Sequence, residues 1–122
     1  RPLVPDEVIR AAVAKARKFA AAAPAVRVKD TIKVSTDGAV DATPDRSTLY
    51  AVQTPQVFDR DLLAAALQNA KTQGLAVTDD CSAVEALGMP VQLTDGDEEN
   101  IKITTPLDLE LAALILRRRA EA

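Results

Sequence analysis

Residues 49–56 read Leu49-Tyr50-Ala51-Val52-Gln53-Thr54-Pro55-Gln56, and a helical pattern follows them as far as Gly74. The first four residues predict a short buried strand, and the next four predict a loop. Asp59 is a typical N-cap residue, and apolar residues recur behind it at helical spacing, at Leu63, Ala66, Leu67 and Ala70. Gly74 suits a helix C-terminus. The stretch therefore predicts a strand, a loop and a helix, which indicates an α/β fold.

The alternation of strands and helices continues towards the C-terminus. Residues 78–80 begin a shorter helix that carries Val84 and Leu87, and residues 91–93 and 101–103 predict two further strands. In the second strand, Ile101 and Ile103 share one face and Lys102 lies on the other. The run Thr105-Pro106-Leu107-Asp108 matches a capping box with proline at the first helical position. The helix that follows is expected to bury a stripe made of Leu107, Leu111, Leu114 and Ile115.

Towards the N-terminus, the pattern predicts a helix and then a hairpin. The helix opens at Pro5 and is closed by the alanines 20–23 and Pro24, and its expected apolar stripe is Ile9, Val13, Ala16 and Ala20. Residues 26–34 predict a strand, residues 35–38 a turn and residues 39–43 a returning strand. Together they suggest a mostly polar β-hairpin over about residues 28–46. Because a two-stranded hairpin is marginally stable alone, this one is expected to protrude and to pack against something else.

Composition argues against several classes of function. The 122 residues suit one small domain, and the net charge of −3 provides no basic field that would favour nucleic acid. No apolar run is long enough to cross a bilayer. The chain has no histidine, which removes Ser–His and Cys–His catalysis and histidine-based metal sites. Cys81 is the only cysteine, which fits a reducing cytoplasm and indicates a small packed residue near a helix start.

The start of the chain and its small number of strands suggest that these residues are a piece of a larger domain. The chain begins with Arg1-Pro2 and without methionine. The predicted strands are few for a complete doubly wound sheet. We therefore expect part of a doubly wound, Rossmann-like α/β domain, made of residues 1–27 and 47–122, from which residues 28–46 protrude as a hairpin arm.

Four ordered motifs carry a resemblance to a known enzyme family. They are Val28-Lys29-Asp30-Thr31-Ile32-Lys33; Thr43-Pro44-Asp45-Arg46-Ser47 with Leu49 to Phe58; Thr78-Asp79-Asp80 with Ser82 and Glu85; and Asn100 to Pro106 with Asp108-Leu109. In this order and spacing they resemble the 2-C-methyl-D-erythritol 4-phosphate cytidylyltransferases. Arg1-Pro2 is similar to the end of an Asp-Ala-Ala-Arg-Pro segment of that family, whose glycine-rich nucleotide loop lies upstream of it.

The resemblance implies a nucleotidyl transfer in the synthesis of isoprenoid precursors. A phosphate oxygen of methylerythritol phosphate would attack the α-phosphorus of CTP, and pyrophosphate would leave. The resemblance also implies a Rossmann-like nucleotidyltransferase fold, a homodimer joined through the hairpin arm, and a cytoplasmic location. It implies a Mg²⁺ ion that is bound mostly by CTP phosphates and upstream residues, and it names no metal ligand in this chain.

By the same resemblance, five residues have roles in the site. Lys102 and Arg46 are the catalytic candidates, and Arg1, Thr31, Arg46, Thr54 and Lys102 are the substrate-binding candidates. Arg1, Thr54 and Lys102 would act in their own subunit, whereas Thr31 and Arg46, on the arm, would complete the partner's site. From pattern alone, Lys102 is a surface lysine on an edge strand. Arg46 is then a turn cap or a partner of Asp45.

Other charged residues have simpler interpretations, and the function has alternatives. Asp79 and Asp80 suit the first turn of a helix, residues 95–99 suit a solvated turn, and the arginines 117–119 suit a solvated helix end. A cytidylyltransferase for another polyol phosphate, such as ribitol 5-phosphate, is the enzymatic alternative. A non-catalytic dimerisation fragment is the alternative from another class.

Overall fold

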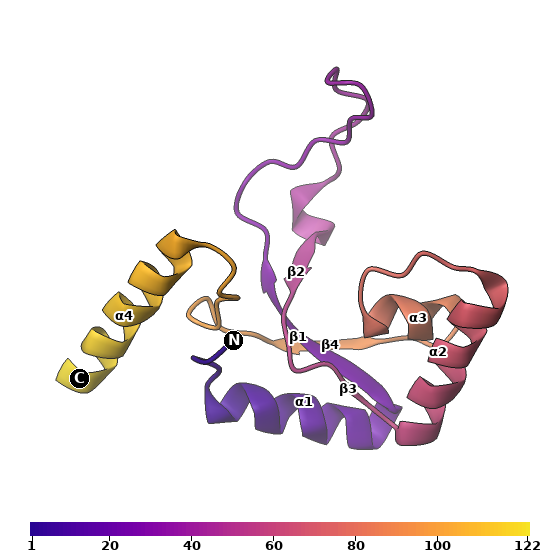
Figure 1. Cartoon of the computed structure of the whole chain (residues 1–122), viewed down its shortest axis with the longest axis horizontal. Helices are drawn as coiled ribbons and strands as arrows, with labels where there is room; N and C mark the ends of the chain where they lie inside the picture. The colour runs from indigo at the N-terminus through magenta and orange to yellow at the C-terminus, as the bar shows by residue number, and fades with distance from the viewer.

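The computed structural model describes all residues from Arg1 to Ala122 (Figure 1). The helices are α1 (Asp6–Phe19), α2 (Arg60–Gln73), α3 (Asp80–Ala86) and α4 (Pro106–Glu121), with a 3-10 turn η1 at Arg46–Thr48. The strands are β1 (Ala21–Arg27), β2 (Tyr50–Val52), β3 (Val57–Phe58) and β4 (Gln92–Asp95). They form one mixed sheet around β1, in which β2 and β3 run antiparallel to β1 and β4 runs parallel to it. The predicted α/β class is confirmed.

The central strand begins where a helix closure was predicted. Helix α1 ends at Phe19, Ala20 takes a left-handed conformation with φ 72°, and Ala21 is already paired with Phe58 in the sheet. The helix therefore ends at the alanines, as predicted, but the strand predicted over 26–34 is wrong in its bounds, because β1 already includes the alanines 21–23 and ends at Arg27. Ala21, Ala22 and Ala23 are fully buried, because α1 packs against β1 and β4 on one side and α2 and α3 gather around Ala21. Small side chains allow this close packing on both faces.

Helix α1 buries Ala16 as predicted, but the rest of its buried face differs from the predicted stripe. Its buried residues are Val8, Ala12 and Ala16, whereas Ile9 is exposed and Val13 is half-buried. Asp6 and Glu7 in the first turn, and Arg17 and Lys18 in the last, complement the helix dipole as expected.

Helix α2 has its predicted caps, and α3 begins where it was predicted, with a capping box that was not predicted. The Asp59 side chain accepts a hydrogen bond from the Leu62 amide, and Gly74 ends α2 in a left-handed conformation. Asp79 forms a capping box with Ser82 at the start of α3. The main core joins Ala21 to residues of these helices, namely Ala66, Ala70, Ala83 and Val84. Leu67, which was predicted on the same face as Ala66 and Ala70, is exposed, and so is Leu87.

Residues 101–103 lie beside α4 rather than in the sheet. They form no strand, which contradicts the prediction, although the predicted alternation persists. Ile101 and Ile103 are half-buried against a second, small core of Leu3, Ala112 and Ile115, and Lys102 between them is exposed. Packing against a helix therefore replaces the expected strand pairing.

Helix α4 begins at its predicted capping box but buries fewer leucines than expected. Thr105 accepts from the Asp108 amide, and backbone hydrogen bonds from the amides of Thr104 and Thr105 help to lower the pKa of Asp108 below its usual value. The buried positions are Ala112 and Ile115, whereas Leu107, Leu111 and Leu114 are exposed. The predicted leucine stripe is correct only at Ile115. No helix in the chain combines the length and the apolar character that crossing a bilayer requires.

Residues 28–46 project from the sheet as a long excursion between β1 and β2 (Figure 1). The predicted two-stranded ladder is absent, because a single bridge, Val34 with Ala42, joins the two legs. Lys33 Nζ adds one side-chain contact, 2.9 Å from Thr43 Oγ1. Strand β2, at the base of the excursion, is exposed rather than buried as predicted. The division into a domain and an arm stays a prediction.

Gly96 allows the turn after β4 to approach β1 closely. Its amide donates to the Ala25 carbonyl at 2.9 Å, and a Cβ atom added here would lie 2.6 Å from Gln53 Oε1 and 2.9 Å from the Ala25 oxygen. We expect Gly96→Ala to lower the free energy of unfolding by about 1–3 kcal/mol, because the turn must move away from β1. Urea denaturation followed by circular dichroism measures this. Gly38→Ala, at a tip glycine with open space around it, is the control for a loss caused by backbone conformation alone. A loss for Gly96→Ala no larger than the control's would contradict the packing argument.

Candidate functional site

The structure brings three of the predicted site residues to one cavity. Arg1, Thr54 and Lys102 line a space of about 290 Å³ together with Val52, Gln56 and Asp79. Arg1 and Lys102 also line an adjoining cavity of about 490 Å³, which includes Arg27 and Lys29 from the end of β1 and the start of the arm. The residues come from the N-terminus, the loop after β2 and the segment before α4, which meet in space (Figure 1).

Arg1 is held by the main chain of the opposite segment. Its Nη1 donates to the carbonyl oxygen of Asn100. Partial burial lowers the pKa of the Arg1 guanidinium, which nevertheless stays charged at neutral pH. The remaining N–H groups of a guanidinium can form paired hydrogen bonds with a phosphate or carboxylate.

Thr54 lies on a loop that is fixed from the inside. The Thr54–Pro55 peptide bond is cis. Thr54 is exposed and lines the small cavity. Its carbonyl accepts from Asn100 Nδ2 at 3.0 Å. Gln53, which precedes it, is buried and donates its backbone amide to the Pro24 carbonyl of β1 at 2.8 Å. The loop is thus attached to the central strand.

Lys102 provides an available positive charge. It takes part in none of the three salt bridges of the chain, and its side chain is exposed at both cavities. Ile101 and Ile103 fix the backbone on either side of it by packing near α4. A cation that is anchored but unpaired suits the stabilisation of an anionic ligand.

The acidic residue of the cavity has a structural role. Asp79 Oδ1 accepts from the Ser82 amide at 2.8 Å, and Oδ2 accepts from Gln56 Nε2 at 3.0 Å. Gln56 Oε1 in turn accepts from the Cys81 amide at 3.2 Å, which ties the loop to α3. No group of three or more acidic or cysteine side chains in the chain is arranged to hold a metal ion.

Thr31 and Arg46 do not line the small cavity, although Asp30 and Ile32, on either side of Thr31, line the larger one. Both are exposed on the excursion 28–46, and neither lines the cavities of Arg1 and Lys102. Arg46 Nη1 donates to the Lys29 carbonyl at 2.6 Å and holds the two legs together at their base. The expected alternative, a pair with Asp45, is wrong, because Asp45 accepts from Ser47 as the cap of η1.

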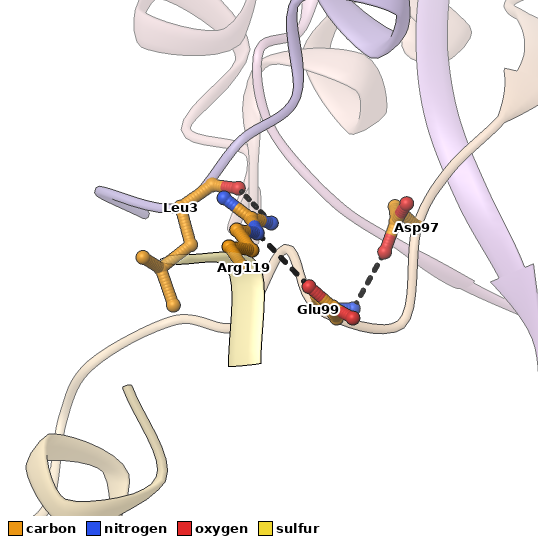
Figure 2. Close-up of polar contacts among 4 residues, drawn as sticks. All are labelled: Leu3, Asp97, Glu99 and Arg119. Atoms are coloured by element: carbon orange, nitrogen blue, oxygen red, sulfur yellow. Dashed lines mark hydrogen bonds and ion pairs between the residues drawn. The ribbon is translucent and has the colours of Figure 1, made fainter. Parts of the chain in front are cut away.

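Arg119 connects helix α4 to the N-terminal segment and to the turn after β4 (Figure 2). Arg119 Nη2 donates to the Leu3 carbonyl at 2.9 Å, and Nε donates to Glu99 Oε1 at 3.0 Å. The Glu99 amide donates to Asp97 Oδ1 at 2.7 Å. Arg119 therefore does not belong to a freely solvated helix end, as was predicted for residues 117–119. The acidic turn is also tied down, since Glu98 pairs with Lys29 at 2.9 Å.

Gln53, Gln56 and Asn100 are site residues that the sequence reasoning missed. Gln53 and Asn100 are the two buried polar residues of the chain, and both line the larger cavity. Gln56 lines the smaller one. The only indication of their role in the sequence was that they lie close to Thr54 and Lys102, within the motifs that carry the family resemblance. A buried amide is recognised only when its hydrogen-bond partners are known.

Cys81 is a packed residue, as predicted. It is buried in α3, and burial, assisted by the charges of Asp79, Glu85 and Asp80, raises the pKa of its thiol from 9.0 to about 12. Since the thiolate is the nucleophile, we expect alkylation by iodoacetamide at pH about 8 to be about 1,000-fold slower in the folded than in the unfolded protein.

The same shift has a consequence for stability. The pKa of the Cys81 thiol is higher in the folded than in the unfolded protein, so its contribution to stability is complete below about pH 9 and is lost as the pH rises towards 12.

The predicted slow alkylation of Cys81 is checked by mass spectrometry of the alkylated protein, with and without urea. Equal rates in the two states would contradict the burial of Cys81.

The comparisons with known proteins agree on one family. A sequence profile described as 2-C-methyl-D-erythritol 4-phosphate cytidylyltransferase matches residues 1–118. The protein of that name from Desulforamulus reducens is 53% identical over 120 residues, which are 98% of this chain and 51% of the relative. The one from Caldanaerobacter subterraneus is 50% identical over 119 residues, 97% of this chain and 52% of the relative. The chain thus spans about half the length of the curated relatives it matches.

Solved structures give the same result. The crystal structure of 2-C-methyl-D-erythritol 4-phosphate cytidylyltransferase from Thermus thermophilus superposes with a TM-score of 0.85 and 37% identity, over 96% of this chain and 58% of the other. The 4-diphosphocytidyl-2C-methyl-D-erythritol synthase of Anaerococcus prevotii gives 0.87 and 35%, over 96% of this chain and 55% of the other. These neighbours confirm the predicted Rossmann-like nucleotidyltransferase fold.

Proposed function

Because this chain belongs to the 2-C-methyl-D-erythritol 4-phosphate cytidylyltransferase family, we propose that it forms part of a cytoplasmic enzyme that transfers a cytidylyl group from CTP to methylerythritol phosphate. The products would be 4-diphosphocytidyl-2-C-methyl-D-erythritol and pyrophosphate. The observation that carries the proposal is the cavity where Arg1, Thr54 and Lys102 meet. Two cations and a hydroxyl at one small cavity suit a phosphate-bearing substrate.

The chemistry needs positioning and positive charge more than acid–base catalysis. A phosphate oxygen of methylerythritol phosphate attacks the α-phosphorus of CTP in line with the bond to the leaving pyrophosphate. Lys102, which has no carboxylate partner, stabilises the negative charge that gathers on the phosphate oxygens. Arg1 and Thr54 hold the phosphate of the acceptor.

Mg²⁺ would have its main ligands outside these residues. The single carboxylate in the small cavity, Asp79, already accepts two hydrogen bonds, and no cluster of three suitable side chains is present in the chain. The family resemblance implies that the triphosphate of CTP and residues that this chain does not contain would hold the ion. Its contribution would be to neutralise phosphate charge.

The arm supports a proposal of two shared sites in a homodimer. Thr31 and Arg46 lie on an excursion that projects from the sheet (Figure 1), and neither lines the small cavity of its own chain. Exposed apolar residues accompany them on it, namely Ile32, Val34 and Val40. In a two-fold dimer each arm would bring the partner's Arg46 and the partner's Thr31 to the site.

The test is CTP-dependent release of pyrophosphate by the product of the full reading frame that encodes this chain. Methylerythritol phosphate and ribitol 5-phosphate are compared as acceptors, and the cytidylylated product is identified by mass spectrometry. Release with methylerythritol phosphate supports the proposal. Faster turnover of ribitol 5-phosphate would keep the chemistry and reject the substrate. No release with either acceptor would favour a non-catalytic fragment.

A further inference from the structure

We propose that Asn100 is a positioning residue of this site, which holds the groups that contact phosphate without touching substrate itself. This inference rests on the proposed function. Asn100 is fully buried, stands two residues before Lys102 and is hydrogen-bonded to the segments that carry Arg1 and Thr54. One residue thus joins the three parts of the chain that carry Arg1, Thr54 and Lys102.

Each polar group of Asn100 except one is engaged. Its carbonyl accepts from Arg1 Nη1, and its backbone amide donates to the Asp97 carbonyl at 3.0 Å. Its side-chain Nδ2 donates to the Thr54 carbonyl at 3.0 Å and to Gln53 Oε1 at 3.1 Å. Both of these partners are oxygen acceptors, so only an amide nitrogen or another donor can occupy the position.

Gln53 makes this arrangement rigid. Its Nε2 donates to the Asp97 carbonyl at 2.8 Å, and its Oε1 accepts from the Asp97 amide at 3.2 Å. The side chain of Gln53 is therefore fixed in one orientation, and its oxygen must face Asn100. The loop 97–100 is held at its other side by the contact of Glu99 with Arg119, which also holds the Leu3 carbonyl (Figure 2).

The side-chain oxygen of Asn100 indicates that this position requires the hydrogen-bond donors of the amide group. Asn100 Oδ1 is buried and has no hydrogen-bond partner. A buried oxygen without a partner is unfavourable, so an apolar residue would be preferred here unless the donors were needed. The need is geometric, because cations that stabilise a phosphoryl transition state act only from fixed positions.

The decisive variant is Asn100→Asp, which keeps the shape and replaces the donor by an acceptor. We expect kcat for pyrophosphate release to fall about 30- to 100-fold near pH 8, with KM for CTP changed less than about 3-fold. The deficit should shrink as the pH is lowered. A buried carboxyl facing two carbonyl oxygens has a raised pKa, and its protonated form donates one hydrogen bond again. The matched control is Asn69→Asp on α2, which makes the same chemical change at the only other asparagine.

A second variant, Asn100→Ser, tests the inference if the Asn100→Asp protein does not fold. Asn100→Ser retains one donor on a shorter side chain, and we expect it to lose about 10-fold in kcat. Thermal melts followed by circular dichroism show which variants are folded under the assay conditions. A folded Asn100→Asp protein with kcat within about 2-fold of the Asn69→Asp control would overturn the inference. If Asn100→Asp does not fold, a folded Asn100→Ser protein at the control level does the same.

A binding measurement separates this inference from the proposed function. Pyrophosphate is titrated calorimetrically into the unsubstituted protein and into the folded Asn100 variants. If the unsubstituted protein shows no transfer, the proposed function fails, and the inference is then judged on pyrophosphate affinity. An affinity about 10-fold weaker in the Asn100 variant than in Asn69→Asp supports positioning of the cations, since charge-assisted hydrogen bonds need fixed geometry. Equal affinities, or no binding by any of them, overturn the inference.

Discussion

Replacing Lys102 by methionine is expected to lower kcat for cytidylyl transfer by about 100- to 1,000-fold, the usual cost of removing one preorganised donor from a charged transition state. Methionine keeps most of the length of the side chain and removes the charge. Lys102 is exposed and forms no salt bridge, so the variant should fold normally. Initial rates of pyrophosphate release with both substrates at saturation measure the change.

The control for Lys102→Met is Lys71→Met, at an exposed lysine in the last turn of α2. We expect its rate to equal that of the unsubstituted protein. Lys102→Arg keeps the charge in a different shape and should retain an intermediate rate. If Lys102→Met raised only KM and left kcat unchanged, the lysine would bind the ground state and would not be the catalytic cation.

If Arg46 contacts the phosphate of methylerythritol phosphate as proposed, Arg46→Ala should lower kcat/KM for this substrate by about 100-fold, because that charged contact is lost. The contact would come from the partner's Arg46, so two inactive proteins should complement each other. When Arg46→Ala and Lys102→Met chains are co-expressed, random pairing makes half of the dimers mixed, and each mixed dimer has one intact site. About one quarter of the full activity should then return.

The outcome of the mixing experiment distinguishes two geometries. If Arg46 acts in its own subunit, no mixed dimer has an intact site and the activity stays at the level of the separate variants. Arg10→Ala, at an exposed arginine of α1 whose only ion pair is with Asp6, is the matched control for loss of a surface arginine. Analytical ultracentrifugation shows whether the Arg46→Ala chain still forms dimers.

The elements that were predicted well are those with strong local signals. The caps at Asp59 and Thr105 and the left-handed Gly74 fix the ends of two helices through contacts within a few residues. Such contacts form in any tertiary context, so the sequence alone is sufficient to place them. The α/β class follows from the same elements.

The errors occurred where tertiary packing outweighs local preference. Alanine is the best helix former, yet Ala21 to Ala23 form the central strand because only small side chains fit between α1 and the other helices. The leucines of α4 are exposed because the helix packs through Ala112 and Ile115 alone. Neither outcome can be derived from periodicity.

The candidate site was predicted in part, through resemblance rather than through pattern. Arg1, Thr54 and Lys102 do meet at one cavity, although their distances along the chain give no hint of it. Thr31 and Arg46 do not join them in the same chain, and their roles stay a prediction. Gln53 and Asn100 were missed because an amide becomes informative only when it is known to be buried.

The alanine-rich core has a thermodynamic consequence. Ten of the fifteen buried apolar residues are alanines, whose side chains remove little apolar surface from water when the chain folds. The heat capacity change of unfolding follows that apolar area and usually amounts to about 12–15 cal/mol/K per residue. In this chain it should fall below that range. The curve of stability against temperature is then flatter, so the fold gains little from moderate cooling and loses stability gradually on warming.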